Sequence, residues 1–540
     1  MSYVYLLDTT LRDGTQGEGV SLTVADKLKI AEKLDDLGVA YIEGGFPGAN
    51  PKDEEFFQLA RSLRLRHAKL TAFGATRRPG VRVEDDAGVR AVLEASTPAV
   101  AIVGKAWDFH VTEALRIDLD ENLAMIRDTV QYLKQQGREV IFDAEHFFDG
   151  FKRNRAYALA TVRAAWEAGV DWVALCDTNG GSMPHEIYTI VQQVLQEVPV
   201  QVGIHTHNDC ELAVANSLAA VQAGARMVHG TINGIGERCG NANLASIMPN
   251  LELKLGYQCL PSRDHLRLLT PVARFVGEVC NLVAHSYQPF VGHSAFAHKG
   301  GIHVSAIQRD PETYEHISPE LVGNERRVLL SELSGVSNVL AQAQAFGIPT
   351  EGREAELRRL LERIKQMEHM GYQFEGAEAS QELLFRRALN DFTPPFAVLA
   401  VRVDTDVQHQ GEATSQAIIK LEVDGEVVHT VSEGNGPVNA LDAVLRKALA
   451  PHRPEIRHMH LTDYKVRVLD EKDATAARVR VLIESTDGDH VWRTVGVSEN
   501  VIAASWEALV DSIQYYLALV GAKRTVVEAV STHEKILPNG

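Results

Sequence analysis

The sequence has no apolar run close to the roughly 18 residues that a membrane-spanning helix needs. The first ten residues, Met1–Thr10, have no basic and apolar signal pattern either. Cysteine is scarce, and its five positions form no CxxC pair: Cys176, Cys210, Cys239, Cys259 and Cys280. An odd number of unpaired cysteines argues against a disulfide framework or a zinc ribbon. We therefore expect a cytoplasmic protein with reduced thiols and no membrane partner.

Positive charge is also in short supply. The chain has 54 Lys and Arg residues against 72 Asp and Glu, a formal net charge of −18. Binding to nucleic acid requires a basic surface, so this class of partner is excluded. The sequence also lacks a phosphate-binding GK[ST] loop and a serine nucleophile elbow; the stretch Gly434–Pro437 is a turn signal. Any anionic substrate must bind at a locally basic site.

The length of 540 residues predicts two or three domains. In the first part of the chain, short apolar runs alternate with helical patterns such as Thr23–Leu37. The predicted strands are Val4–Thr10, Tyr41–Phe46, Lys69–Gly74, Val100–Lys105, Val140–His146, Trp172–Thr178, Gln201–Asp209 and Met227–Ile232. Eight such units within about 250 residues are the expected size of a (β/α)8 TIM barrel. A doubly wound open sheet is the competing architecture.

Polar side chains at the ends of the predicted strands favour the barrel. They are Asp8, Arg12, Asp13, Glu43, Glu145, Asp177, Thr178, His205, His207, Asp209, Asn233, Glu237 and Asn241. A barrel brings the carboxyl ends of all its strands to one face, where the active site of such enzymes lies. An open sheet would spread the same residues along an edge.

A metal site is expected among these residues. His205 and His207 are two apart on a predicted strand, so both imidazoles point to one side of it. Asp13 is a candidate third ligand and Asn241 a fourth. This nitrogen and oxygen set suits Zn²⁺ or Mn²⁺ better than Ca²⁺, with Mg²⁺ as an alternative. The competing interpretation is a hydrogen-bonded histidine pair without a metal.

Beyond the barrel the pattern changes twice. Residues 261–393 are mostly helical, with an amphipathic packing helix at Glu354–Met370, and Pro394–Pro395 marks a boundary. A βββα order then occurs twice: strands Phe396–Val403, Ser415–Val423 and Glu426–Val431 with helix Val438–Ala450, then strands Lys465–Leu469, Ala477–Glu484 and Val491–Val497 with helix Ala503–Leu517. We expect a barrel domain at 1–260, a helical linker at 261–393 and an α+β regulatory domain at 394–530. A dimerisation module without a ligand is the alternative for the last.

Several stretches together resemble one enzyme family. They are Asp8–Gln16 (DTTLRDGTQ), Glu43–Pro47 (EGGFP), Glu145–Gly150 (EHFFDG), Asp177–Gly180 (DTNG), His205–Asp209 (HTHND) and Asn233–Leu244 (NGIGERCGNANL). The pattern is similar to that of the DRE-TIM metallolyases, in the branch of 2-isopropylmalate, homocitrate and citramalate synthases. With the C-terminal layout, the resemblance covers nearly the whole chain.

The resemblance implies a role for each matching residue. It implies metal binding by Asp13, His205 and His207, with Asn241 close by or ligating. Arg12 resembles the arginine that binds the keto acid and stabilises its developing alkoxide. Thr178 resembles the residue that holds the keto acid carboxylate, and Glu145 an active-site glutamate.

The same resemblance implies a base outside the barrel. His303, in Gly300–His303 (GGIH), matches the histidine that enolises acetyl-CoA, and Tyr314 matches a tyrosine near it. His298 is a rival for the base, because the stretch Ala297–His303 (AHKGGIH) contains both histidines.

The implied reaction is a metal-dependent condensation of acetyl-CoA with a small 2-keto acid. The stretches HNDCELAVANS and AHKGGIH resemble the citramalate branch, which predicts pyruvate as the keto acid and a role in isoleucine biosynthesis. The alternatives are 2-ketoisovalerate, as in 2-isopropylmalate synthases, and a cleavage reaction, as in acyl-CoA lyases of the same superfamily. The family also implies a homodimer whose C-terminal domain binds isoleucine, or alternatively leucine.

Overall fold

The computed structural model describes residues 2–283, 285–329, 334–406, 414–469 and 477–520. The chain divides into two compact units, which are described separately. The barrel unit comprises Met1–Phe296 and Ile317–Arg326, and the C-terminal unit comprises Ala297–His316 and Arg327–Gly540. None of the described helices is long and apolar enough to cross a membrane.

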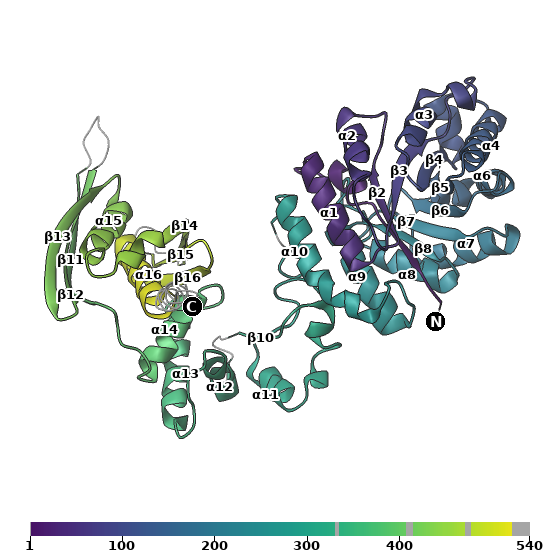
Figure 1. The fold of residues 1–540 in the computed structure, drawn as a ribbon. Helices are drawn as coiled ribbons and strands as arrows, with labels where there is room; N and C mark the ends of the chain where they lie inside the picture. Colours follow the sequence, from purple (N-terminus) through teal and green to yellow (C-terminus); the bar gives the residue numbers. More distant parts are fainter. Residues whose placement is uncertain (1, 284, 330–333, 407–413, 470–476, 521–540) are drawn as a thin grey trace, which may run out of the picture. The chain divides into compact units, whose positions relative to one another are not determined.

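The barrel unit contains eight parallel strands that close on themselves (Figure 1). The strands are β1 (Tyr5–Asp8), β2 (Tyr41–Gly45), β3 (Lys69–Ala75), β4 (Ala99–Lys105), β5 (Glu139–Glu145), β6 (Trp172–Asp177), β7 (Val202–Thr206) and β8 (Met227–Gly230). The strand β8 pairs with β1, from Met227 opposite Tyr5 to Gly230 opposite Asp8, which closes the ring. The expected TIM barrel is confirmed, and the open sheet is excluded.

Helices follow the strands and surround the barrel. They are α1 (Val24–Leu37), α2 (Pro51–Ala60), α3 (Ala87–Glu94), α4 (Leu119–Gln135), α5 (Phe147–Arg153), α6 (Arg155–Glu167), α7 (Pro184–Glu197), α8 (Ala213–Ala223), α9 (Leu244–Pro249) and α10 (Leu269–Val279). The first shows how local sequence sets their limits. Thr23 and Asp26 form a capping box at its start, and Gly38 ends it in the left-handed region at φ 94°.

The alternation of side chains along each strand positions the site. In β5, Val140, Phe142 and Ala144 belong to the apolar layer between strands and helices, whereas Ile141 belongs to a smaller cluster inside the barrel. Side chains two apart on a strand share a face, so Asp143 points into the barrel above Ile141. The interior is therefore apolar at its floor and charged toward the carboxyl ends of the strands.

The C-terminal unit begins with helices and ends with sheets. A two-stranded sheet joins β9 (Ala297–His298) and β10 (Arg327–Val328). The helices are α11 (Gly301–Arg309), α12 (Val336–Ala345), α13 (Glu354–His369) and α14 (Glu378–Ala388). Two three-stranded antiparallel sheets follow, β11 (Ala397–Asp406), β12 (Thr414–Val423) and β13 (Glu426–Gly434), then β14 (His460–Val468), β15 (Val479–Thr486) and β16 (Val491–Ser498).

Each sheet is followed by one helix, α15 (Pro437–Leu449) or α16 (Val501–Tyr515). The expected βββα repeat is thus confirmed; the boundaries expected after residues 260 and 393 stay predictions. The two halves share a core that includes Ile419, Leu445, Ile483 and Leu509. They differ on their outer faces, because Val495 and Leu482 of the second sheet pack into a separate cluster with α12, α13 and α14.

Candidate active site

The carboxyl ends of the barrel strands enclose a cavity of about 430 Å³. Among the residues lining it are six to which the family resemblance gives a role: Arg12, Asp13, Glu145, Thr178, His205 and His207. Asn241 adjoins them through its hydrogen bond to Asp13. The two remaining candidates, His303 and Tyr314, belong to the C-terminal unit.

The two histidines of the HxH pair lie next to two other buried side chains, those of Asp13 and Asn241. His205 lies in β7, whereas His207 lies just past its end and pairs with Asn241 through a backbone bridge. The two imidazole Nε2 atoms are 3.3 Å apart, and that of His205 is 3.7 Å from Asp13 Oδ2. The Asn241 amide nitrogen donates to the same Asp13 oxygen at 3.1 Å. The predicted metal ligands are therefore neighbours in space.

The protonation states of this group suit a cation. Burial lowers the pKa of His205 to about 3 and lowers that of His207, so both imidazoles are neutral. Burial tends to raise the pKa of Asp13, but the adjacent Arg12 guanidinium opposes it and the pKa is lowered. Two neutral imidazoles beside an ionised carboxylate are a donor set that divalent ions of the zinc type accept.

The orientation of the Asn241 amide determines whether Asn241 can act as a fourth metal ligand. In the part of the chain that the structure describes, no three His, Cys, Asp or Glu side chains are spaced as a preformed metal site. Within the group, the amide nitrogen of Asn241 faces Asp13 and His205, and its oxygen Oδ1 is buried without a hydrogen-bond partner among the described residues. Turning the amide over would point Oδ1 at the space between the ligands. The four residues fit a divalent ion in that orientation.

Arg12 is held rigidly beside this group. Its Nε donates to Glu43 Oε2 at 2.7 Å and its Nη1 to Asp13 Oδ1, and its guanidinium lies 3.8 Å from the centre of the Phe73 ring. Burial raises the pKa of Glu43 to about 7, although Arg12 opposes this shift. A fixed guanidinium at the cavity wall can receive negative charge without rearranging.

Glu145 and Thr178 are each fixed by a neighbouring strand end. Glu145 pairs with Lys105 of β4. The hydroxyl oxygen of Thr178 accepts from the backbone N–H of His146 at 2.9 Å, so its own proton remains for another acceptor. His146 makes this contact in the left-handed conformation, at φ 55°.

One buried pair of ionisable residues was not predicted from the sequence. Asp143 of β5 and His229 of β8 face each other inside the barrel, with 3.8 Å between Oδ1 and Nδ1. Burial, with Glu43 adding to it, raises the pKa of Asp143 well above its usual range, and burial lowers that of His229. The available signal was an ionisable residue in the middle of an apolar strand, as in Phe142–Ala144.

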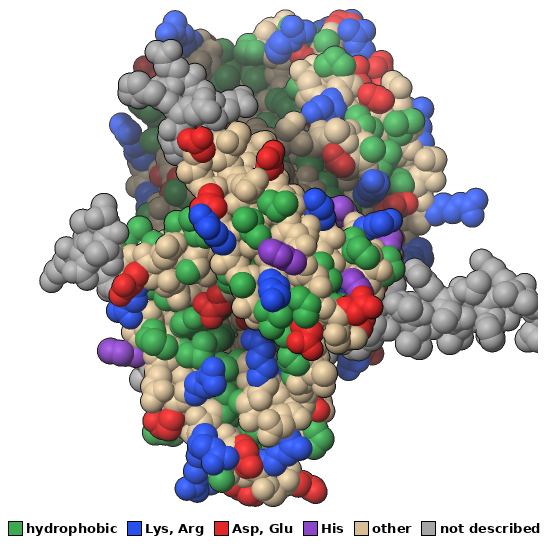
Figure 2. All heavy atoms as spheres, turned by 90° about the vertical axis from the view of Figure 1, so that its left-hand side faces the viewer, with side chains coloured by type: hydrophobic (Ala, Val, Ile, Leu, Met, Phe, Trp, Pro, Cys, Tyr) green, Lys and Arg blue, Asp and Glu red, His purple; other side chains and the backbone are tan. Residues whose placement is uncertain are grey.

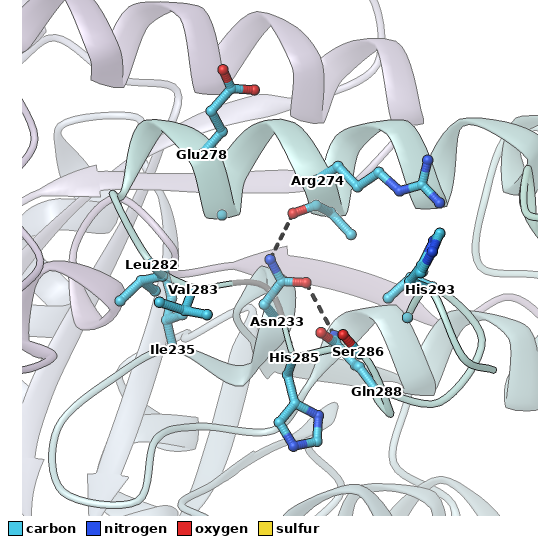
Figure 3. Close-up of a pocket in the computed structure, with 14 residues that line it drawn as sticks. Asn233, Ile235, Arg274, Glu278, Leu282, Val283, His285, Ser286, Gln288 and His293 are labelled. Atoms are coloured by element: carbon cyan, nitrogen blue, oxygen red, sulfur yellow. Dashed lines mark hydrogen bonds between the residues drawn. The ribbon is translucent and has the colours of Figure 1, made fainter. Parts of the chain in front are cut away.

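A second cavity, of about 530 Å³, is lined by residues of the loop after β8 and of α10 (Figure 3). Asn233 fixes its wall by donating to the carbonyl of Ala273 at 2.7 Å and accepting from Gln288 at 3.0 Å. Ile235 lines this cavity, and Glu237, two residues further on, lines the first. The two cavities therefore flank the same loop.

In the C-terminal unit, His303 and Tyr314 lie against each other. Their rings stack with centroids 4.2 Å apart. Close to them in sequence, His298 Nε2 is 3.1 Å from Glu315 Oε1. The structure thus gives the two candidate bases different neighbours, an aromatic ring for His303 and a carboxylate for His298.

Three family models match the chain: HMGL-like over residues 3–275, the homocitrate synthase post-HMGL domain-like family over 290–371 and the LeuA allosteric (dimerisation) domain over 375–517. The (R)-citramalate synthase of Aquifex aeolicus is 55% identical over 95% of this chain and 98% of its own length. That of Geobacter sulfurreducens is 54% identical over 96% and 98%. The 2-isopropylmalate synthase of Methanocaldococcus jannaschii is 30% identical over 95% of each chain.

These matches extend from the barrel to the C-terminal repeat, and their order along the chain is that of the domains. The chain belongs to the HMGL-like family and, within it, to the (R)-citramalate synthases. The resemblance in the sequence is thereby confirmed. Enzymes of this group use acetyl-CoA and a divalent metal ion.

Proposed function

We propose that this chain condenses acetyl-CoA with pyruvate and hydrolyses the product thioester, giving (R)-citramalate and CoA for isoleucine biosynthesis. One observation carries the proposal: five relatives named (R)-citramalate synthase are 46–55% identical over 95–98% of the chain. Relatives named as 2-isopropylmalate synthases, one of them as probable, are 30–34% identical. Pyruvate is accordingly favoured over 2-ketoisovalerate.

The barrel cavity supplies the keto acid half of the reaction. Asp13, His205, His207 and Asn241 would hold a divalent ion, Zn²⁺ or Mn²⁺ with Mg²⁺ as an alternative, and such an ion polarises a chelated keto group. Arg12 lies beside Asp13, where its charge can stabilise the keto oxygen as it becomes an alkoxide. The hydroxyl group of Thr178 can donate a hydrogen bond to the pyruvate carboxylate.

The C-terminal unit would supply the base. In this proposal His303 removes a proton from the acetyl methyl group, the resulting enolate carbon bonds to the keto carbon of pyruvate, and the alkoxide takes up a proton. Water then cleaves the thioester and CoA leaves. The methyl proton is far less acidic than an imidazolium, whose reference pKa is about 6.5, so positioning must contribute most of the rate. Tyr314 stacks on the His303 ring and limits its orientation.

The second cavity is our candidate for the nucleotide end of acetyl-CoA. Apolar groups such as Ile235 and Leu282 can pack against an adenine ring, and Arg274, which lines the same cavity, can supply a positive charge to the phosphates. If this holds, Arg274→Ala raises KM for acetyl-CoA severalfold but leaves KM for acetyl-pantetheine unchanged, because the shorter thioester has no nucleotide. Arg267→Ala, which removes an exposed arginine outside the residues lining the cavity, is the matched control. Equal effects on both thioesters would contradict the placement.

The test of the reaction is CoA release, followed with a thiol reagent, on pyruvate, 2-ketobutyrate, 2-ketoisovalerate and 2-ketoglutarate. A pocket shaped for a methyl group rejects an isopropyl group by about 1–3 kcal/mol, so kcat/KM should favour pyruvate over 2-ketoisovalerate by about tenfold or more. Removal of the metal with a chelator should abolish turnover, and Mn²⁺ or Zn²⁺ should restore it. A preference for 2-ketoisovalerate would identify the alternative activity.

The C-terminal repeat would regulate the enzyme. Its match to the LeuA allosteric (dimerisation) domain supports a homodimer with an amino-acid effector, and isoleucine, the end product of the proposed pathway, is our candidate. Leucine is the alternative. Activity and melting temperature should both respond to millimolar isoleucine; a lack of response to either amino acid would leave dimerisation as the role of the repeat.

A further inference from the structure

One short segment, Ala297–His316, carries the two residues that we expect to act in the enolisation of acetyl-CoA, His303 and Tyr314. It enters through β9 and continues into α11, where His303 follows Gly301 and Ile302. A turn at Pro311–Thr313 then brings the chain to Tyr314 and Glu315. On its open side the segment exposes His303, with Ile302 80% and Tyr314 46% exposed.

The two ends of the segment are joined by a buried contact between two side chains. His298, at the start, lies 3.1 Å from Glu315, near the end, and their side chains are 13% and 2% exposed. Their neighbours in sequence are the functional candidates: Tyr314 directly precedes Glu315, and the helix of His303 begins three residues after His298. The contact therefore closes a loop of chain that carries His303 and Tyr314, whose stacked rings have centroids 4.2 Å apart.

Backbone contacts fix where the loop starts. The strand β9 pairs with β10, and Leu329 N–H donates to the carbonyl of His298 at 2.8 Å. The buried side chain of Asn338, on α12, donates to the carbonyls of both Lys299 and Leu329 at 3.2 Å. His298 is thus anchored to the rest of the C-terminal unit, and Glu315 is anchored to His298.

We propose that His298 and Glu315 form a clasp that positions His303 against Tyr314, so that both are positioning residues for enolisation and His298 is not the base. The inference rests on the proposed function, in which His303 takes the methyl proton. A base must reach its substrate within hydrogen-bond distance, which suits the exposed His303. The Nε2 of His298 is already engaged by a nearly inaccessible carboxylate, and a misplacement of the base by about 1 Å is enough to cost about a hundredfold in rate.

Substitutions that keep or break the contact test the clasp. His298→Gln retains an N–H donor for Glu315 but has no imidazole, whereas His298→Ala removes the contact. We expect His298→Ala to lower kcat on the order of a hundredfold with KM for pyruvate and metal affinity unchanged. His298→Gln should retain most of the parent kcat. Lys299→Ala, which removes an exposed ion pair with Glu375 next to the clasp, is the matched control.

The partner residue gives an independent measurement. If His298 and Glu315 act through each other, Glu315→Ala should lower kcat as His298→Ala does, and the double variant should be no slower than either single variant. Amide hydrogen exchange in Gly301–Arg309 should accelerate in both alanine variants and remain slow in His298→Gln. This second readout does not depend on activity, so it tests the clasp even if the chain fails to use pyruvate.

Two results would overturn the inference. One is a His298→Gln variant as inactive as His298→Ala while its hydrogen exchange matches the parent, which would make the imidazole of His298 itself the reacting group. The other is near-parent kcat and exchange in His298→Ala, which would leave the pair without a positioning role. Failure of the parent enzyme to release CoA with any keto acid would instead refute the proposed function.

Discussion

At the scale of single residues, the barrel interior concentrates carboxylates around one guanidinium. Asp8, Asp13, Glu43 and Asp143 are all buried, and Arg12 pairs directly with two of them. Removing a carboxylate from water costs several kcal/mol unless a cation or hydrogen bonds compensate. The pKa shifts follow this rule: the pKa of Asp13, next to Arg12, is lowered, and that of Asp143 is raised.

Asp8 offers a test of this cost away from the proposed ligands. It accepts from the N–H and hydroxyl of Thr10, but burial dominates and raises its pKa to about 7 from 3.8. Because the pKa of Asp8 is higher in the folded than in the unfolded chain, the folded protein is most stable below the unfolded pKa. That stability is lost as the pH rises from the unfolded pKa to the folded pKa, here between about pH 4 and 7. Asp8→Asn does not titrate. Its free energy of unfolding relative to the parent should therefore increase by up to about 3 kcal/mol from pH 5 to pH 7.

Urea unfolding at the two pH values measures this difference, with the metal content of both proteins kept equal. Asp26→Asn is the control, because hydrogen bonds from Thr23 lower the pKa of Asp26 and its contribution is already complete at pH 5. If Asp8→Asn shows the same pH dependence as the parent, the carboxylate of Asp8 is ionised in the folded protein at pH 5.

Sequence reasoning found the residues of the barrel cavity whose neighbours form a recognisable motif. Asp13, His205 and His207 were predicted as one group, and the structure brings them together. It placed Glu43 at the same face of the barrel, but it did not predict which residues of distant strands pair with one another. Glu43 is 31 residues from Arg12, and His229 lies three strands after Asp143. Such pairs depend on the closure of the barrel and on the pairing register of its strands. The hydrophobic periodicity of the sequence specifies neither of these.

At the scale of elements, strand positions were predictable and strand ends were not. The apolar run predicted a strand through Asp209, but β7 stops at Thr206. The chain turns there, since Glu211 N–H donates to the carbonyl of Asn208 at 2.8 Å and Glu211 adopts φ 60°. His207 therefore lies in a loop, where its backbone bridges to Asn241. Turn geometry, which strand periodicity does not encode, sets this part of the site.

One arginine ties three of these loops together. Arg238, after β8, donates to both carboxylate oxygens of Asp209, after β7, at 2.8 and 2.9 Å. It also donates to the carbonyl of Thr178, after β6, at 2.7 Å. The loops so joined carry His207, Asn241 and Thr178, so the contacts of Arg238 support the proposed ligands from outside.

Loss of the contacts of Arg238 with Asp209 and Thr178 should weaken metal binding. We expect Arg238→Ala to weaken divalent-metal affinity by about 10- to 100-fold, as removal of outer contacts to ligands commonly does. Arg238→Lys should restore little, because an ammonium cannot donate to two oxygens in a fixed fork. Competition with a chromophoric chelator measures the affinity, and Arg61→Ala, at the residue that caps the end of α2, is the control. Unchanged affinity in Arg238→Ala would show that the loops hold their positions without it.

At the scale of the whole molecule, the two βββα repeats have the same order but different surroundings. The outer face of the second sheet packs on the helices before it, through Leu482, Val495 and Val497. On the first sheet, Ala417, Ile419 and Leu421 of β12 face α15, so Ile418 and Glu422 face the opposite side. Val431 and Val427 of β13 pair with those two residues and are 40% and 55% exposed. Sequence similarity between the repeats could not reveal this difference, because it arises from packing.

The match to a dimerisation domain gives that open face a use, and the final prediction follows from it. A stable protein interface has an apolar core, and charges introduced there oppose association. We expect Val427→Glu combined with Val431→Glu to convert a dimer into a monomer at micromolar concentration, as measured by sedimentation velocity. Val491→Glu, at an exposed end of the second sheet, should leave the dimer intact and serves as the control. The barrel cavity is remote in sequence from the change, so metal affinity should remain at the parent value. Inhibition by isoleucine should weaken together with dimerisation if the effector acts through the paired repeats. A double variant that sediments as a dimer would exclude this face as the contact, and one that is monomeric yet fully inhibited would separate regulation from assembly.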